Sequence, residues 1–185
     1  MFLAQVPSSL GMVVPVIADL DPVRARSACY SAGWDKELIG KTRFIEDGQD
    51  LIAAEDVDVV VEATGKPRAG VFHAQKAIHE GKHVVMRVDV QGAKRLRELI
   101  PDALLIFIIP PSLDVLRKHL EKRGVNSKKE MEKRLAAASE EIRKSDLFDF
   151  TVTNEEDRLD DTVRQVVEII ETEAVKVPPR NLVIQ

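Results

Sequence analysis

Asp19 is the first residue whose type and position suggest chemistry. It stands near the carboxyl end of the apolar run 12–20, just before a segment with a helical pattern. At this place in a dinucleotide-binding unit, an acidic side chain accepts hydrogen bonds from the adenosine ribose hydroxyls. The same carboxylate could instead begin the helix or lie solvated in the turn. Asp19 is therefore a candidate cofactor ligand, with a helix-initiating role as the alternative.

Neither a metal site nor a nucleic-acid surface is indicated by the sequence. His79 and His83 are four residues apart, but Gly81 between them interrupts the helix that would bring both onto one face, and no third ligand lies near. The basic segments 93–100 and 117–124 contain no aromatic residues that could stack on bases. We expect no bound metal and no nucleic-acid partner.

The composition is typical of a folded globular protein without a strong electrostatic preference. Of the 185 residues, 44% are hydrophobic and 31% are charged, with a formal net charge of -4, which favours neither nucleic acid nor an anionic membrane. No apolar run approaches the ~20 residues of a bilayer span, and residues 1–11 lack the charged start of a signal peptide. Cys29, the single cysteine, excludes an intrachain disulfide and is most simply a small core residue. We expect a cytoplasmic protein without a membrane partner.

Short β-branched runs alternate with helical patterns along the chain. This order predicts an α/β fold of three layers, a mostly parallel sheet of five to six strands with helices on both faces. Several runs are apolar without alternation, which predicts strands that are covered on both sides. The expected strands are 12–20, 42–46, 56–64, 82–90, 103–109 and 150–154.

The expected helices have recognisable ends. Asp21 followed by Pro22 suits a first helical turn, and Ser127 with Glu130 forms a capping-box pattern that opens another helix. The expected helices lie between 21 and 33, over 67–80 and 92–100, between 112 and 124, from 128 onward, and over about 160–173.

Two stretches of the first half, "VPVIADLDPVRARSACYSAGW" and "DVDVVVEATGKPRAGVFHAQKAIHEGKHVVM", carry a first resemblance. Residues 1–86 resemble the NAD(P)-binding domain of homoserine-dehydrogenase-like oxidoreductases. The resemblance implies that Asp19 binds the ribose and that the turn Ala63-Thr64-Gly65 lies beside the cofactor. That family opens with a strand and a G-x-G-x-x-G turn on the pyrophosphate, whereas this sequence begins past that point. We therefore expect a partial Rossmann-like unit without its phosphate cradle.

In the second half, "DVQGA", "IIPPS", "KRG", "KRLAAA" and a late "TN" follow one another with characteristic spacing. Residues 82–175 resemble the carboxyl half of guanylate kinase. The resemblance implies phosphoryl transfer from ATP with magnesium to GMP, with Arg123 and Arg134 of a mobile lid stabilising the moving group. An arginine suits this role because its planar fork grips two phosphate oxygens. The resemblance also places Asn154 near adenine and Asp89 near magnesium and its water.

Three departures from the guanylate kinase pattern argue against activity. The sequence contains no G-x-x-x-x-G-K-[ST] loop to cradle phosphates. His119 stands where the family has another lid arginine, and Arg87 replaces an acidic residue that helps to recognise guanine. The family's other GMP-binding elements fall in the replaced first half. As alternatives to their implied roles, Arg123 and Arg134 are solvated charges and Asn154 is a turn residue.

Four readings of the function remain open. The first is a nucleotide-binding protein of guanylate kinase lineage, inactive or very weak alone, and the second is an NAD(P)-binding oxidoreductase-like fragment. The third is a non-catalytic module that binds a protein partner, and the fourth is a recombined or engineered chimera. No cofactor is certain, since ATP with magnesium and NAD(P) are implied only by resemblance, and the oligomeric state is unknown. We expect the two halves to form one continuous core through a buried strand at 82–90, followed by a tail at 176–185, because no flexible linker separates them.

Overall fold

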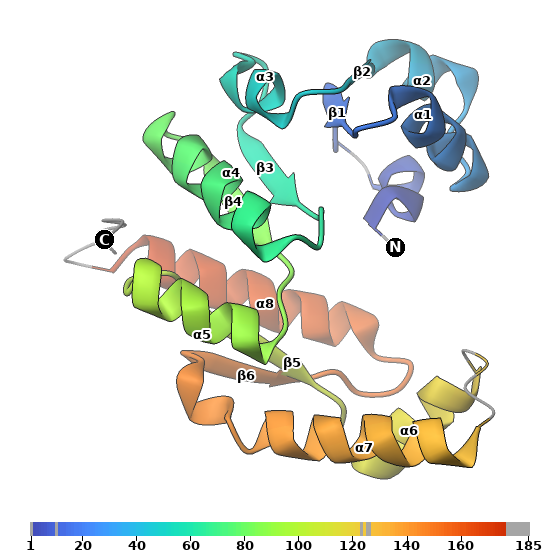
Figure 1. Ribbon diagram of the computed structural model, residues 1–185, viewed down its shortest axis with the longest axis vertical. Coiled ribbons are helices and arrows are strands. Elements are labelled where there is room, and N and C mark those ends of the chain that lie inside the picture. Colours follow the sequence, from blue (N-terminus) through green and yellow to red (C-terminus); the bar gives the residue numbers. More distant parts are fainter. Residues whose placement is uncertain (1, 10, 123, 125–126, 177–185) are drawn as a thin grey trace. The chain divides into compact units, whose positions relative to one another are not determined.

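A computed structural model of the chain describes residues 2–9, 11–122, 124 and 127–176 (Figure 1). The chain divides into two compact units, unit 1 at Met1–Arg87 and unit 2 at Val88–Gln185. Helices and strands alternate in both units, and each strand pair is parallel, so the expected α/β class is confirmed. In the described residues the strands are joined two by two in small parallel sheets.

All six expected strands are present, and each is shorter than its apolar run. The ladders cover only the residues that face a partner strand, whereas the hydrophobic pattern extends into the flanking turns. The strands are β1 at Val16–Ala18, β2 at Arg43–Ile45, β3 at Val59–Glu62, β4 at His83–Met86, β5 at Ile106–Ile109 and β6 at Phe150–Thr153.

Unit 1 contains β1 to β4 and four α-helices. The helices are α1 at Pro22–Ser31, α2 at Lys36–Lys41, α3 at Gly48–Ala53 and α4 at Pro67–His79, and two 3-10 turns, η1 at Phe2–Ala4 and η2 at Val6–Ser8, precede them. The short helices α2 and α3 were not among the expected ones. Their start signals were nevertheless in the sequence, because Asp35 and Asp47 cap them by accepting backbone N–H groups at 2.7 Å.

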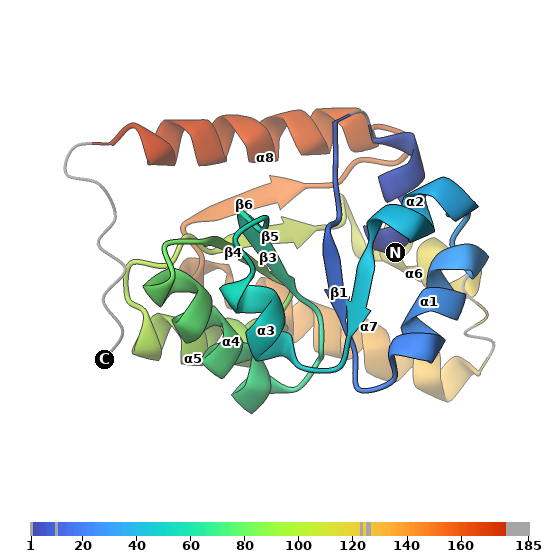
Figure 2. The ribbon, with the colours of Figure 1, turned by 90° about the horizontal axis from the view of Figure 1, so that it is seen from above.

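Two apolar clusters stabilise unit 1. The first joins strands β1 and β3 to helices α3 and α4 through Val16, Val60, Ile52 and Ala77. Figure 2 shows α3 and α4 beside the β3–β4 pair. The second cluster packs Cys29 and Ile39 around Trp34, whose indole N–H donates to the carbonyl of Leu3 at 2.7 Å.

Among the described residues of unit 1, a helix covers one face of the β3–β4 pair. α4 packs against the side that carries Val60 and Glu62. On the opposite side, Val59, Val61 and Val85 are 49%, 42% and 56% exposed. The apolar run predicted the strand correctly, and the burial of each face depends on what packs against it.

At the boundary between the two resemblances, the strand expected over 82–90 ends early and a helix begins within it. β4 ends at Met86, residues 87–89 form no regular structure, and α5 begins at Val90. Val88, expected inside a buried strand, is 40% exposed. The carboxylate of Asp89 accepts the N–H of Gly92 at 2.7 Å, and this N-terminal cap starts the helix within the predicted strand.

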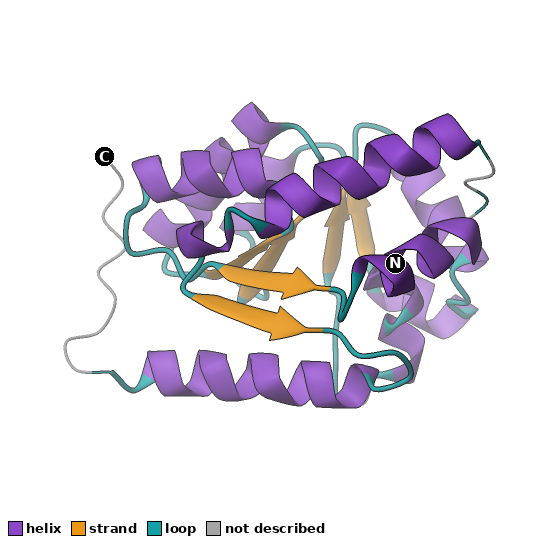
Figure 3. Ribbon diagram, turned by 90° about the horizontal axis from the view of Figure 1, so that it is seen from below, coloured by secondary structure: helices purple, strands orange, loops and turns teal. Residues whose placement is uncertain are grey.

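The described residues of unit 2 contain the β5–β6 pair and four α-helices. The helices are α5 at Val90–Leu99, α6 at Leu113–Lys122, α7 at Lys128–Ile142 and α8 at Leu159–Ala174, with a 3-10 turn η3 at Ser145–Leu147. α8 runs alongside β6, as the views from above and below both show (Figures 2 and 3). α6 packs on α7 through Leu120, Met131 and Leu135.

Arg97 of α5 links the start of β5 to the start of β6. Its guanidinium donates to the carbonyls of Pro101 and Ala103 at 2.6 and 3.0 Å, and to a carboxylate oxygen of Asp149 at 3.0 Å. The same Asp149 oxygen accepts the N–H of Leu105 at 2.8 Å. Because an arginine has five donors in one plane, a single side chain can satisfy several acceptors from two segments of the chain.

In the part of the chain that the structure describes, no helix combines the length and the apolar character needed to cross a bilayer.

Candidate functional site

Asp19, the candidate ribose ligand in unit 1, directly follows β1 and is held there by three hydrogen bonds. Its N–H donates to the carbonyl of Ile45 at 3.0 Å. Its Oδ1 accepts the N–H of Asp21 at 2.9 Å and the Nη2 of Arg24 at 2.7 Å. The Asp21 N–H and then the Arg24 guanidinium lower the pKa of the Asp19 carboxyl from its usual value, so this group is anionic at neutral pH.

The helix-initiating role belongs to the neighbouring acid. The Oδ1 of Asp21 accepts the N–H of Arg24 at 2.9 Å and caps α1, whose first residue is Pro22. Asp19 instead closes the turn that leads into the helix. Its side chain is 34% exposed, which leaves the carboxylate partly accessible to a ligand.

Thr64 and Gly65, the candidate cofactor turn, follow β3. The hydroxyl and the N–H of Thr64 both donate to one carboxylate oxygen of Glu62, at 2.5 and 3.1 Å. Gly65 has a φ of +67°, a left-handed conformation that favours glycine. The sequence predicts the turn but not the carboxylate that shapes it.

Glu62 is a buried acid with a side chain only 7% exposed. The Nδ1 of His73 on α4 lies 3.7 Å from its Oε1. The backbone of α4 also approaches the second carboxylate oxygen of Glu62 closely. A Cβ atom added at Gly70 would lie 3.0 Å from Oε2. The burial of Glu62 had a signal in the sequence, namely its position within the expected strand 56–64. Because side chains alternate along a strand, Glu62 shares the face of Val60.

Asn154, the candidate base ligand in unit 2, follows β6. Its N–H donates to the carbonyl of Ile109 at 2.8 Å, and its Oδ1 accepts the hydroxyl of Thr162 at 2.9 Å. Thr162 lies in the first turns of α8 and is buried, with 4% exposure. This hydrogen bond orients the side-chain amide, so that its NH2 group remains as a donor on the other side.

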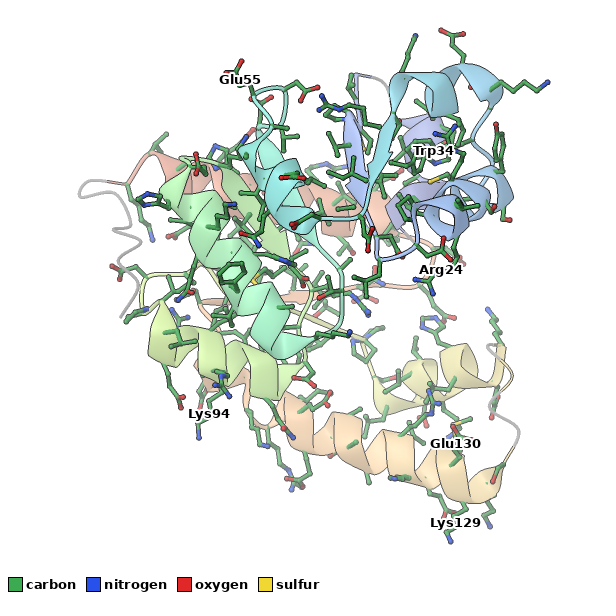
Figure 4. The ribbon with its side chains drawn as sticks, turned by 45° about the horizontal axis from the view of Figure 1, so that its top comes forward. Arg24, Trp34, Glu55, Lys94, Lys129 and Glu130 are labelled. Atoms are coloured by element: carbon green, nitrogen blue, oxygen red, sulfur yellow. The ribbon has the colours of Figure 1, made fainter. Side chains whose placement is uncertain are left out.

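Arg134, one of the two candidate lid arginines, lies on the exposed side of α7. Its Nε and Nη2 donate to the Oε1 of Glu130 at 3.1 and 2.7 Å. Glu130 therefore serves Arg134 in place of the expected capping box, and Ser127 makes no side-chain cap. Arg123, the other candidate, lies outside the described residues. Figure 4 labels Glu130 next to Lys129 on this helix.

Two further positions were singled out in the guanylate-kinase-like half. Asp89 is exposed and acts as the cap of α5, as described above. His119, at the place of a family arginine, lies with its Nε2 3.7 Å from the Oε1 of Glu156. The structure thus places an acid beside the position at which the resemblance implies a lid arginine in guanylate kinase.

An open hollow of about 290 Å³ lies between the end of β6 and α8. Asp161 stands between its two arginines, 2.5 Å from Arg158 and 3.1 Å from Arg164, and offsets their charge. The hollow is therefore polar without being a strong anion site. Its lining residues are Thr153, Glu155, Arg158, Asp161, Thr162, Arg164, Gln165 and Glu168.

The candidate residues of unit 2 bind locally and not to one another. In the described part of the chain, no hydrogen bond or ion pair joins Asp89, Arg134 and Asn154. Among all the residues that the structure describes, no group of three or more His, Cys, Asp or Glu side chains is gathered to hold a metal ion. The roles implied for Asp89 at magnesium and for the lid arginines at phosphate remain predictions.

Comparison with known proteins finds two families. The family model of guanylate kinase matches residues 68–173. The model of the homoserine dehydrogenase NAD-binding domain matches residues 3–101. Each match covers more than half of the 185 residues, and the two overlap over residues 68–101, from α4 through β4 to α5.

Curated relatives of the chain are guanylate kinases. The enzyme of Lactobacillus johnsonii is 36% identical over 148 residues, which are 79% of this chain and 69% of that protein. The enzyme of Thermus thermophilus is 38% identical over 119 residues, which are 64% of this chain and 52% of that protein. The enzyme of Rhodococcus jostii is 41% identical over 114 residues, and there too the chain spans about half of the relative, 53%. The chain therefore belongs to the guanylate kinase family, and its first half belongs to the family of homoserine dehydrogenase NAD-binding domains.

Proposed function

We propose that this chain is a nucleotide-binding protein of guanylate kinase lineage whose 185 residues, acting alone, transfer phosphate from ATP to GMP very slowly or not at all. The observation that carries the proposal is that G-x-x-x-x-G-K-[ST] occurs nowhere in these residues. In nucleotide kinases of this type, the backbone, lysine and hydroxyl of that loop hold the phosphates and magnesium. Catalysis of phosphoryl transfer depends mainly on such positioning and cationic stabilisation.

Local contacts of two lid positions support the proposal. Glu130 engages Arg134 through two N–H donors, and Glu156 lies beside His119. The Glu130 carboxylate offsets a positive charge that a phosphate would otherwise meet, and the Glu156 carboxylate adds negative charge beside His119. An imidazole is also a weaker fixed cation at neutral pH than the guanidinium that the family places there.

A coupled assay of ADP release with ATP and GMP tests the inactivity. We expect a rate no higher than that of the matched variant Arg134→Ala, with a full-length guanylate kinase as the positive control. Turnover of about 1–100 s⁻¹, the usual range of kinases, together with its loss in Arg134→Ala, would overturn the proposal.

The proposed binding of a nucleotide without turnover depends on the side chain of Asn154. We propose that its NH2 group donates to the base of a nucleotide, while Thr162 holds its Oδ1. Titration of ADP or GMP, followed by amide chemical shifts around β6, should show weak saturable binding. Asn154→Asp keeps the size and the acceptor for Thr162 but removes the donors, so it should weaken binding and leave the fold intact. Equal shifts in both proteins would remove Asn154 from the site.

A second candidate function is supported by the family match at residues 3–101 and by the accessible Asp19 carboxylate. In this function unit 1 binds NAD(P) through the adenosine ribose. Titration of NADH and NADPH fluorescence should saturate, and Asp19→Ala should weaken the binding. Glu55→Gln, an exposed charge in the same unit (Figure 4), is the matched control. A flat titration would exclude this function.

A further inference from the structure

Helices α6 and α7 form a pair with an apolar seam of their own. Leu116 and Leu120 of α6 pack with Met131 and Leu135 of α7, and among the described residues the members of this cluster come from these two helices alone. Residues 110–112 join the pair to β5, and residues 143–149 join it to β6. Because the seam does not depend on the strands, the two helices can move as one body about these connections.

In the part of the chain that the structure describes, one polar contact between side chains connects this helix pair to another element of unit 2. The Nε2 of His119 on α6 lies 3.7 Å from the Oε1 of Glu156, in the loop between β6 and α8. This distance exceeds that of a normal hydrogen bond but suits an ion pair when the imidazole is protonated. The two side chains are 34% and 38% exposed, so solvent protons reach the contact.

Among the described residues, Glu156 is the charged group from another element that meets His119. α7, which packs on α6, presents its buried apolar residues to that helix, and its charged residues are exposed. Glu155, the other acid at the start of the loop, is exposed and makes no ion pair with His119 in the described structure. On α6 itself, Lys122 lies one turn further along and adds positive charge. Since a histidine changes its charge between about pH 5 and 8, the attraction between His119 and Glu156 depends on pH.

We propose that His119 and Glu156 form a pH-sensitive latch, which holds the helix pair α6–α7 to the loop that follows β6. When the imidazole is protonated, the two side chains attract each other and the closed arrangement is favoured. When the imidazole is neutral, this attraction is lost and the helix pair opens more often about its two connections. Glu156 lies two residues from Asn154, so the closed helix pair borders the candidate nucleotide site. The latch itself requires no nucleotide, and its test is therefore independent of the proposed binding.

Fluorescence energy transfer between two labels on the full chain measures the closed and open populations. The labels are attached through Lys129→Cys on α7, at an exposed position that Figure 4 labels, and through Thr172→Cys on the exposed side of α8. Cys29 has no exposed surface, which protects it from the label. Lowering the pH from about 8.5 to about 5.5 should raise the ratio of closed to open molecules about two- to fivefold, the usual effect of an exposed ion pair. An unchanged ratio would overturn the proposal.

Variants at both ends of the latch separate it from a general effect of pH. Glu156→Gln keeps the size of the side chain but not its charge, so the response to pH should vanish. His119→Arg keeps a cation at every pH, so the closed population should remain high at about pH 8.5. Glu155→Gln, the matched control, should respond as the unaltered chain does.

A full response to pH in Glu156→Gln or in His119→Arg would show that the latch is not formed by these two side chains. Far-UV circular dichroism of each variant checks that the helices are formed. If Glu156→Gln loses helix content, His119→Arg carries the test, because it changes the other end of the contact.

Discussion

Replacing Arg97 by methionine should loosen the β5–β6 pair of unit 2. The guanidinium donates four hydrogen bonds, of which those to Pro101, Ala103 and Asp149 are 2.6, 3.0 and 3.0 Å long. The fourth, to Leu147, is 3.4 Å long and contributes little. Methionine keeps the apolar stem but donates nothing, so the change isolates the polar interactions.

The expected loss follows from the number and burial of these bonds. A net hydrogen bond contributes about 0.5–1.5 kcal/mol, and more when one partner is charged. Arg97 and Asp149 are 26% and 25% exposed, so solvent weakens but does not cancel the ion pair. Three good bonds then give about 2–3 kcal/mol in total. Since about 1.4 kcal/mol is a factor of ten in an equilibrium constant, local opening should become about 30- to 150-fold more frequent.

Amide hydrogen exchange measures this opening within unit 2. The probes are the N–H groups of Asp149 and Asn154, which donate to the carbonyls of Leu105 and Ile109. The N–H of Asp19, which donates to Ile45 in unit 1, is the internal reference. Arg95→Met on the exposed side of the same helix is the matched control. Unchanged exchange in Arg97→Met, or equal acceleration in Arg95→Met, would refute the reasoning.

Three further predictions concern single residues. Thr162→Val removes the donor to the Oδ1 of Asn154 and should lower the stability of unit 2, measured by urea unfolding, by about 1 kcal/mol. Thr162→Ser keeps the hydroxyl and should retain most of that stability. Equal losses in the two variants would contradict the role of the hydroxyl. Folding lowers the pKa of Asp19 from its usual value of 3.8, so the unfolded chain binds the proton more readily. The contribution of Asp19 to stability is therefore present above pH 3.8 and is lost as the pH falls through the lower pKa of the folded chain. Asp19→Asn should therefore destabilise unit 1 at about pH 6 and have little effect at about pH 2, as followed by Trp34 fluorescence in urea. Burial raises the pKa of the Cys29 thiol, which has no exposed surface, so alkylation by iodoacetamide should be slow until unit 1 unfolds; fast labelling of the folded chain would show that the second apolar cluster is open.

The order of elements could be read from the sequence because it depends on local periodicity. Apolar runs located all six strands, and residues such as Asp21, Gly33 and Gly81 marked helix ends close to where the structure has them. These signals act within a few residues, through capping hydrogen bonds and the left-handed conformation that glycine tolerates. The same local patterns carried the resemblance to the two families that the comparisons then found.

The partners of polar side chains could not be read in this way, because several acceptors compete for each donor. Glu130 had the spacing for a capping box, yet its carboxylate binds Arg134 on the next turn. Asp89 was expected at a strand end, yet it caps a helix that starts within the predicted strand. In both cases the choice depends on small differences in free energy between contacts that the sequence permits equally.

By itself, then, the sequence determined the α/β class, the order of the strands and the longer helices, and the membership in two families, all through patterns of near neighbours. Only the tertiary structure decided which faces of the strands are covered, which left Val59 and Val85 exposed. It also decided that Glu62 is buried against α4, that Arg24 binds Asp19, and that Arg97 meets a carboxylate 52 residues away. The physical reason is that burial and polar pairing depend on the groups that folding brings together, and a distance along the chain does not specify them.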